Sequence, residues 1–197
     1  MTIPDRFLVY LPWAIATLLI AAIVHVVSIL LMPTLAPRDA FARLSAYATA
    51  AKADEKLFVL PAPAPGAAVL PYEDASVVVG VCVYDLTKGL LRVAGPVNGE
   101  DYLALSLHAR SGRIFHALTD RSAIRGKIDL LIGDERQIES VNNADAEGAK
   151  PLEVRVVAPM KRGFVVLRAL AKRLSDTPRA RAALEAISCA RQEPPKD

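Results

Sequence analysis

The sequence predicts an α+β chain that is mainly β: one N-terminal transmembrane helix, a short amphipathic helix, and a β-rich, sandwich-like domain with a C-terminal helix. Three observations predict this class. No charged residue occurs in the 31 positions from Phe7 to Pro37. Six or seven short segments with β-branched or alternating apolar residues then follow between turn signals. Near the end, Thr177-Pro178 opens an Ala-rich segment, and proline is favoured at the first position of a helix.

The N-terminal apolar stretch is long enough to cross a bilayer. Its densest part, Trp13 to Met32, has 20 residues, and about 20 helical residues span the hydrocarbon core. Apolar side chains surround it on all sides, which is typical of a helix in lipid. A cleaved signal peptide is the alternative, with Thr34-Leu35-Ala36 as the cleavage site. The length of the apolar run and Pro37 directly after that site favour an uncleaved anchor.

We expect three parts along the chain: the anchor in residues 1–37, an amphipathic helix and a Pro-rich linker in 38–70, and the β-rich domain in 71–197. Asp39 to Ala53 has apolar residues at helical spacing, with Asp39 as the N-cap. Residues 61–66 alternate proline and alanine before a glycine, which indicates an extended connector.

The β segments begin with the β-branched run from Ala75 to Tyr84, which is typical of a central strand covered on both faces. We expect it to form a hairpin with Leu90–Ala94. Tyr102–His108 and Arg113–Thr119 predict a second hairpin around the loop at Gly112. The remaining predicted elements are strands at Lys127–Ile132, Leu152–Val157 and Gly163–Ala169, a polar loop at 140–149, and a helix from Thr177 to about Ala190.

Charge and cysteine content limit the function classes. The net charge is +3, and aromatic residues make up only 6% of the chain. No basic stripe interleaved with aromatics occurs, so we expect no nucleic-acid partner. Cys82 and Cys189 are the only cysteines, and their number permits either one disulfide or two buried thiols. No Cys/His spacing typical of a metal site occurs, so we expect no metal and no cofactor.

The order of turns and strands resembles a known bacterial family. The matching stretches are Tyr84-Asp85-Leu86, Gly95-Pro96-Val97, Asp101 to Leu107, Gly112 to Arg121, and Arg162 to Arg168. On these residues the chain resembles, over about residues 70–190, the family called domain of unknown function twelve fifty-four, in its short, membrane-anchored form. The resemblance implies an exported or membrane-bound β-rich domain. It also implies a companion membrane protein that carries a second domain of unknown function, numbered twelve fourteen, but no reaction.

Polar residues on the second hairpin are the candidates for chemistry. Ser106 and His108 share one face of their strand, and His116 lies on the return strand. Together with Asp85 or Asp120 they offer a nucleophile, a base and a carboxylate. No GxSxG, HExxH, GxGxxG or P-loop pattern accompanies them, so a catalytic triad is the lesser hypothesis.

The first functional hypothesis is therefore a non-catalytic binding or accessory module for another membrane protein. The alternative is an envelope hydrolase-like enzyme that uses the polar face of the second hairpin. We expect a single-pass protein of the bacterial inner membrane, held in the lipid bilayer, with its soluble domain in the periplasm. The basic residues that follow the span, at Arg38, Arg43 and Lys52, favour a cytoplasmic domain by the positive-inside rule. The family resemblance favours export.

Overall fold

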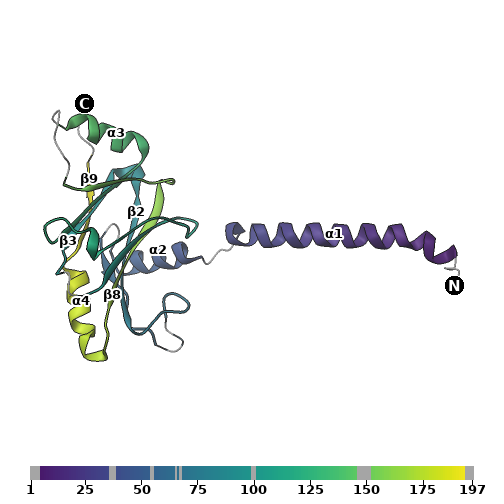
Figure 1. Ribbon diagram of the computed structural model, residues 1–197, viewed down its shortest axis with the longest axis horizontal. Helices are drawn as coiled ribbons and strands as arrows, with labels where there is room; N and C mark the ends of the chain where they lie inside the picture. Colours follow the sequence, from purple (N-terminus) through teal and green to yellow (C-terminus); the bar gives the residue numbers. More distant parts are fainter. Residues whose placement is uncertain are drawn as a thin grey trace. The chain divides into compact units, whose positions relative to one another are not determined.

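The structure is a computed structural model that describes residues 5–35, 39–53, 56–64, 66, 68–98, 101–145 and 152–193. The chain forms two compact units, Met1–Pro37 and Arg38–Asp197, which are described separately. The labels used below are those of Figure 1. The predicted boundary at Pro37 coincides with the division between the units, whereas the predicted linker segment 38–70 belongs to the second unit.

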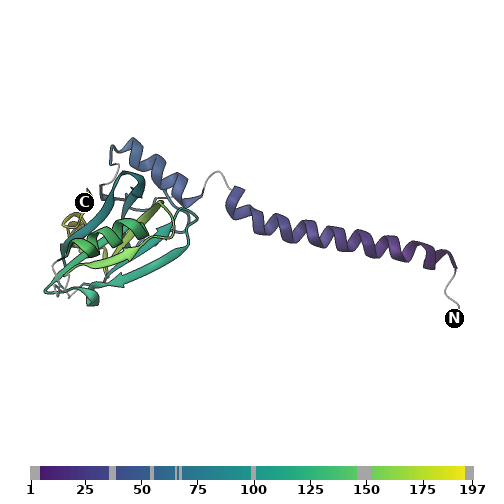
Figure 2. The ribbon, with the colours of Figure 1, turned by 90° about the horizontal axis from the view of Figure 1, so that it is seen from above.

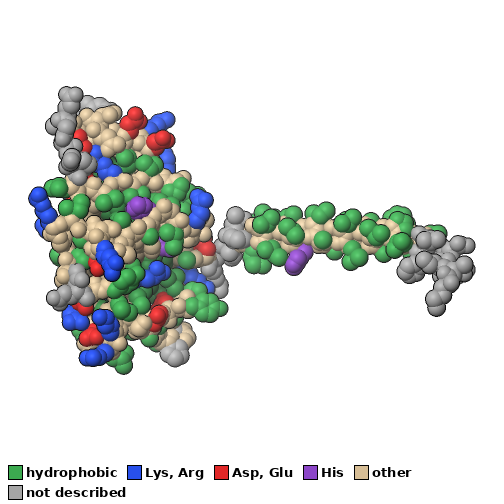
Figure 3. Space-filling view, viewed as in Figure 1, with side chains coloured by type: hydrophobic (Ala, Val, Ile, Leu, Met, Phe, Trp, Pro, Cys, Tyr) green, Lys and Arg blue, Asp and Glu red, His purple; other side chains and the backbone are tan. Residues whose placement is uncertain are grey.

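The first unit is the helix α1 (Asp5–Leu35). Its segment Val9–Met32 has 24 residues with a mean hydropathy of 2.7, and none of it is buried. Figure 3 shows hydrophobic side chains along the helix. The hydroxyls of Thr17 and Ser28 donate to the carbonyls of Trp13 and Val24, at 2.9 and 2.7 Å, so the helix satisfies them itself. By length and composition α1 can cross a membrane, as an anchor or as a signal sequence.

The second unit contains two β-sheets. The first sheet has the strand order β1 (Phe58–Val59), β2 (Val77–Asp85), β8 (Arg162–Leu170), β4 (Leu103–Ala109), β5 (Ile114–Thr119), with antiparallel neighbours throughout. The second sheet has the order β7 (Val154–Val157), β6 (Lys127–Gly133), β3 (Leu90–Pro96), β9 (Ser188–Gln192). Only its β6–β7 pair is parallel. The described chain is thus α+β with mainly strands, as predicted.

One apolar cluster contains residues from both sheets. Alternate residues of β4 and β8 point into it because side chains along a strand alternate between faces. Its fully buried members include Leu107, Leu130, Ile132, Val165 and Leu167. The helix α4 (Thr177–Glu185) adds Ala180 and Leu184 to the same cluster.

The two other α-helices of this unit cover the outer faces of the sheets. The helix α2 (Ala40–Ala50) packs Leu44 and Ala48 against Val81, Phe164 and Val166 of the first sheet, and Figure 2 shows it along one side of the strands. Asp39 caps this helix by accepting a hydrogen bond from the amide of Ala42 at 2.7 Å, as predicted. The helix α3 (Glu135–Ala144) packs Ile138 and Val141 against Leu90 and Leu131 of the second sheet.

Three short 3-10 helices complete the described elements. They are η1 (Leu86–Lys88), η2 (Asp120–Ser122) and η3 (Leu174–Asp176). The first of them redirects the chain between the two sheets. Asp85 accepts hydrogen bonds from the amide and hydroxyl of Thr87, at 3.1 and 2.6 Å. Gly89 follows with a φ of +138°, a conformation that favours glycine.

The predicted pairing of the first two strands is wrong. β2 pairs with β1 and β8, whereas β3 pairs with β6 and β9 in the other sheet. The turn at η1 and Gly89 leads from the first sheet to the second, and it does not return the chain along β2. β2 is nevertheless covered on both faces, since Cys82 and Val81 are each fully buried in different clusters. The predicted hairpin of β4 and β5 is confirmed.

Two predictions in the second half of the chain are also wrong. The segment expected as a polar loop at 140–149 begins with the last turn of α3, which ends at Ala144, and its residues 146–149 lie outside the described residues. This helix is nucleated by a capping box in which Asp134 and Gln137 bond each other's amides, both at 2.9 Å. The expected helix from Thr177 ends at Glu185, and Ser188–Gln192 forms the edge strand β9 instead. Pairing with β3 and a disulfide at Cys189 hold this strand.

Candidate functional site

Ser106 and His108 form a hydrogen-bonded pair on the outer face of the first sheet. Both belong to β4, two residues apart, so their side chains lie on one face as predicted. In the neighbouring strand β8 they lie opposite Val166 and Phe164. The distance from Ser106 Oγ to His108 Nε2 is 3.0 Å. This is the spacing expected between a nucleophile and its general base.

The turn between β4 and β5 orients the imidazole. His108 Nδ1 lies 3.0 Å from the carbonyl oxygen of Gly112. A carbonyl can only accept, so we assign the proton of the neutral ring to Nδ1, which leaves Nε2 to accept the hydroxyl proton of Ser106. Burial lowers the pKa of His108, the Gly112 carbonyl opposes that shift, and the charge of Arg168 lowers the pKa further. The imidazole ring is therefore unprotonated and uncharged at neutral pH.

The pair is enclosed by its neighbours. The exposed fractions of Ser106 and His108 are 8% and 9%. The ring of Phe164 is stacked on the imidazole, with 4.7 Å between centroids and 10° between planes. The hydroxyl of Ser106 also lies 3.4 Å from the carbonyl oxygen of Val166. A substrate would have to open this packing before it could reach the hydroxyl.

The other predicted catalytic residues lie apart from this pair. A β-bulge between Leu107 and His108 shifts the register, so that His116 lies opposite Leu107. Directly opposed residues share a face, and His116 is therefore on the inner side, where its Nε2 is buried without a hydrogen-bond partner in the described chain. His116 therefore does not join Ser106 and His108 on the polar face that the hydrolase-like alternative uses.

The two candidate carboxylates have other surroundings. Asp85 Oδ2 accepts a hydrogen bond from Arg162 Nε at 2.8 Å, and Oδ1 binds Thr87. Asp120 is the first residue of η2, beyond the opposite end of β5. Neither carboxylate is hydrogen-bonded to His108, so the described residues provide a serine–histidine pair oriented by a backbone carbonyl. Among these residues, no group of three or more His, Cys, Asp or Glu side chains is placed to hold a metal ion.

A second feature, not predicted from the sequence, is an apolar cavity of about 240 Å³ beside α4. One wall consists of Ala180 and Ala183 of α4 and of Ala186, the C-cap of this helix, and the opposite wall includes Leu103 and Leu170 of the first sheet. The alanines recur every three residues on one helix face, and their small side chains leave the space open. That spacing was the signal available in the sequence.

Polar residues and one tyrosine border this cavity. Asp101 lies 3.3 Å from the guanidinium of Arg179 and accepts a hydrogen bond from the Asn98 amide at 3.3 Å. Tyr102 lines the cavity with half of its side chain exposed. A mostly apolar cavity with a few polar groups is typical of a ligand or peptide site.

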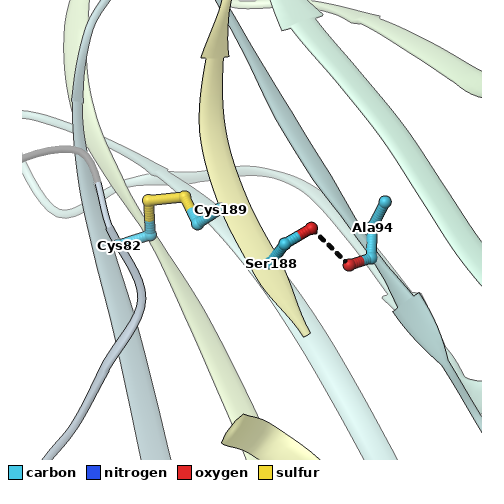
Figure 4. Close-up of a disulfide and its surroundings, with 4 residues drawn as sticks. All are labelled: Cys82, Ala94, Ser188 and Cys189. Atoms are coloured by element: carbon cyan, nitrogen blue, oxygen red, sulfur yellow. Dashed lines mark hydrogen bonds between the residues drawn. A yellow bond between two sulfur atoms is a disulfide. The ribbon is translucent and has the colours of Figure 1, made fainter. Parts of the chain in front are cut away.

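A disulfide joins the two sheets. Cys82 of β2 is bonded to Cys189 of β9, 107 residues later in the sequence. Figure 4 shows the bond beside Ser188, whose hydroxyl donates to the carbonyl of Ala94 at 2.9 Å. The sequence left a bridge and two buried thiols open; the structure has the bridge.

No protein-family model and no curated protein sequence matches the chain. The crystal structure of the VPA0106 protein from Vibrio parahaemolyticus is similar, with a TM-score of 0.53 and 12% identity over 80% of this chain and 37% of that one. A crystal structure of an uncharacterised protein from Burkholderia cenocepacia has a TM-score of 0.45 and 13% identity, over 80% of this chain and 41% of that one. The chain thus spans less than half the length of either protein, and the likeness to the first concerns the fold alone.

Proposed function

We propose that this protein is a single-span, membrane-anchored binding module for another membrane protein, and that it is not an enzyme. The observation that carries the proposal is α1, whose apolar segment Val9–Met32 is covered by no other part of the described chain. Water does not solvate such a surface without a large free-energy cost. A bilayer accommodates it, and the attached two-sheet, sandwich-like unit is then held at the membrane.

The disulfide supports a periplasmic location for this unit. Disulfides form and persist in oxidising compartments such as the periplasm, and are rare in the cytosol. Cys82 is fully buried and Cys189 is 7% exposed, so a formed bridge is protected from reductants. This favours export over the opposite orientation that the basic residues after the span indicate.

The position of an engineered thiol tests this orientation. Both native cysteines are in the bridge, so Ala64→Cys adds a single free thiol at an exposed position of the segment before β2. Labelling by a membrane-impermeant maleimide in intact spheroplasts supports the periplasmic side. Labelling only after lysis contradicts it.

The family resemblance supplies a partner for the proposal. We infer membership of the family called domain of unknown function twelve fifty-four from the matching turns and strands, which include the β4–β5 hairpin. Membership of that family implies a companion membrane protein that carries the second domain, numbered twelve fourteen. The apolar cavity beside α4 is the surface of the described residues best suited to bind such a companion, because its lining is mainly apolar and also includes Asn98, Asp101 and Tyr102.

Photo-crosslinking from the rim of the cavity tests this binding. A photoreactive amino acid at Tyr102 should capture one membrane protein carrying the companion domain. Ala183→Leu fills the cavity and should abolish that capture, whereas Ala182→Leu, on the exposed face of the same helix, should leave it intact. Equal capture by both variants, or no capture from Tyr102, refutes the cavity as the binding surface.

The Ser106–His108 hydrogen bond favours one alternative, an envelope hydrolase-like enzyme. It predicts that a fluorophosphonate probe labels the full-length protein, and that Ser106→Ala abolishes labelling while Ser122→Ala, at an exposed serine, does not. Absence of labelling under conditions that label a control serine hydrolase excludes this alternative. The binding-module proposal fails if the protein is labelled at Ser106 and Ser106→Ala also abolishes turnover of a small ester.

A further inference from the structure

We propose that one end of the second unit, where the β4–β5 and β7–β8 turns meet, binds the anionic phospholipid headgroups of the membrane that holds α1. This inference rests on the proposed anchoring and adds a second, electrostatic attachment to it. We call this surface the basic end. It consists of six exposed residues: Arg110, Arg113, Ile114, Met160, Lys161 and Arg162.

Backbone hydrogen bonds hold the two turns together. The amide of Arg110 donates to the carbonyl of Arg162 at 3.1 Å, and the amide of Ala109 donates to the carbonyl of Arg113 at 2.9 Å. The carbonyl of Lys161 accepts from the amide of Leu86 at 2.8 Å. The four basic side chains therefore project from two adjacent turns whose backbones are hydrogen-bonded.

Most of this positive charge is not neutralised within the unit. Arg162 pairs with Asp85. Arg110 lies over the ring of Phe41, 5.6 Å from its centroid, a contact that leaves its charge in place. Arg113 and Lys161 have no ion pair with any residue in the part of the chain that the structure describes. The carboxylate of Asp39 is engaged as the cap of α2.

Each turn also places an apolar side chain beside its cations. Ile114 follows Arg113 with 54% of its side chain exposed, and Met160 precedes Lys161 with 45% exposed. Cations next to exposed apolar side chains are typical of surfaces that lie at the headgroup level of a bilayer. A cation alone gains only a screened attraction, whereas the apolar neighbour adds burial in the interface.

The connection between α1 and α2 is short. Three residues separate Leu35, the last residue of α1, from Asp39, the cap of α2, so the Cα atoms of Leu35 and Asp39 can be at most about 14 Å apart. Phe41, in the first turn of α2, contacts the basic end through Arg110. This limit holds for any arrangement of the two units, because it depends only on the number of residues between them.

A matched set of charges lies at the other end of the same hairpin strand. Arg121, Arg125 and Lys127 are exposed and follow the end of β5. The six residues of β5 separate them from Arg113 by about 20 Å. Neutralising these three residues lowers the net charge by the same amount as neutralising three residues of the basic end, and it leaves the basic end unchanged.

The test places the full-length chain in lipid nanodiscs that contain either phosphatidylcholine alone or phosphatidylcholine with phosphatidylglycerol. A fluorophore at Ser111→Cys, in the β4–β5 turn, reports quenching by headgroup-labelled lipid. We expect at least twofold stronger quenching in the anionic discs. The triple change Arg110→Gln, Arg113→Gln and Lys161→Gln should reduce quenching to its level in neutral discs, and 0.5 M salt should do the same.

The control triple, Arg121→Gln, Arg125→Gln and Lys127→Gln, should keep the stronger quenching. Equal quenching in both kinds of disc, in protein that is incorporated, overturns the headgroup proposal and leaves the anchoring intact. Loss of quenching in the control triple as well overturns it, because attraction would then depend on total charge. Failure of the chain to enter discs overturns both this proposal and the anchoring.

Discussion

Removing the disulfide should strongly destabilise the second unit. Cys82→Ala with Cys189→Ala releases a closure between residues 107 positions apart. The chain-entropy relation for a loop of this length gives about 5 kcal/mol at 25 °C. Each kcal/mol shifts the melting temperature of a unit this size by roughly 2–4 °C, so we expect a decrease of roughly 10–20 °C.

Calorimetry of the full-length protein in detergent micelles measures this change. Reduced wild-type protein is the matched comparison, since it keeps both sulfur atoms in place and loses only the bond. Ser188→Ala is a further control, because it removes one exposed hydrogen bond to Ala94 beside the bridge and should cost about 1 kcal/mol or less.

The reasoning is refuted if oxidised and reduced wild-type protein melt within about 3 °C of each other while mass spectrometry shows the bridge in the first sample. That result would mean that the bridge restricts the unfolded chain very little, because residual structure in that chain already limits its conformations.

Three further predictions concern the same unit. Burial is the main cause of the lowered pKa of His108, so protonation of this residue favours the unfolded chain. The free energy of unfolding should therefore decrease as the pH drops below about 6.5, the pKa of histidine in an unfolded chain. His108→Gln should weaken this pH dependence, which thermal melts at pH 7.5 and pH 5 would measure. Gly163→Ala would place a Cβ 2.7 Å from Tyr84 Cζ and against the carbonyl of His108; we expect a loss of about 1–3 kcal/mol in denaturant unfolding, and a smaller loss for Gly80→Ala, whose Cβ meets Leu57 Cδ1 at 3.3 Å. Asp134→Ala removes the cap of α3 and should cost about 1 kcal/mol, whereas Glu135→Ala, in the same turn, should cost less; equal losses would contradict the capping role.

Local patterns predicted those elements that depend on neighbouring residues. The unbroken apolar run predicted α1, and Asp39 with helical spacing predicted α2. Alternation around Gly112 predicted the β4–β5 hairpin, which needs only a tight turn. The partners of β2 could not be predicted in the same way, because its main neighbour β8 lies more than 75 residues away and nothing in a β-branched run specifies a distant partner.

The helix α3 was missed because its sequence is polar. Only Ile138 and Val141 are buried in it, so its apolar periodicity is short. The informative signal was the capping pair Asp134 and Gln137, which precedes those two residues. A helix with so few apolar residues is easily mistaken for a loop.

The candidate site was predicted in part. A period of two placed Ser106 and His108 on one face, and the structure confirms that placement. His116 lies on the opposite face from the predicted one because of a single bulge between Leu107 and His108. One extra residue moves every later side chain of a strand to the other face. The sequence gives no sign of this bulge, nor of the Gly112 carbonyl that orients the imidazole.

The position of β8 has a consequence for biogenesis. This strand separates β2 from β4 in the first sheet, yet it is made after both of them. Until residues 162–170 emerge, the two earlier strands have no partner between them, and β3 still lacks β9. A nascent chain therefore exposes apolar strand faces over most of its synthesis and collapses late, by long-range pairing. The first sheet can therefore reach its native strand order only once residues 162–170 have been synthesised.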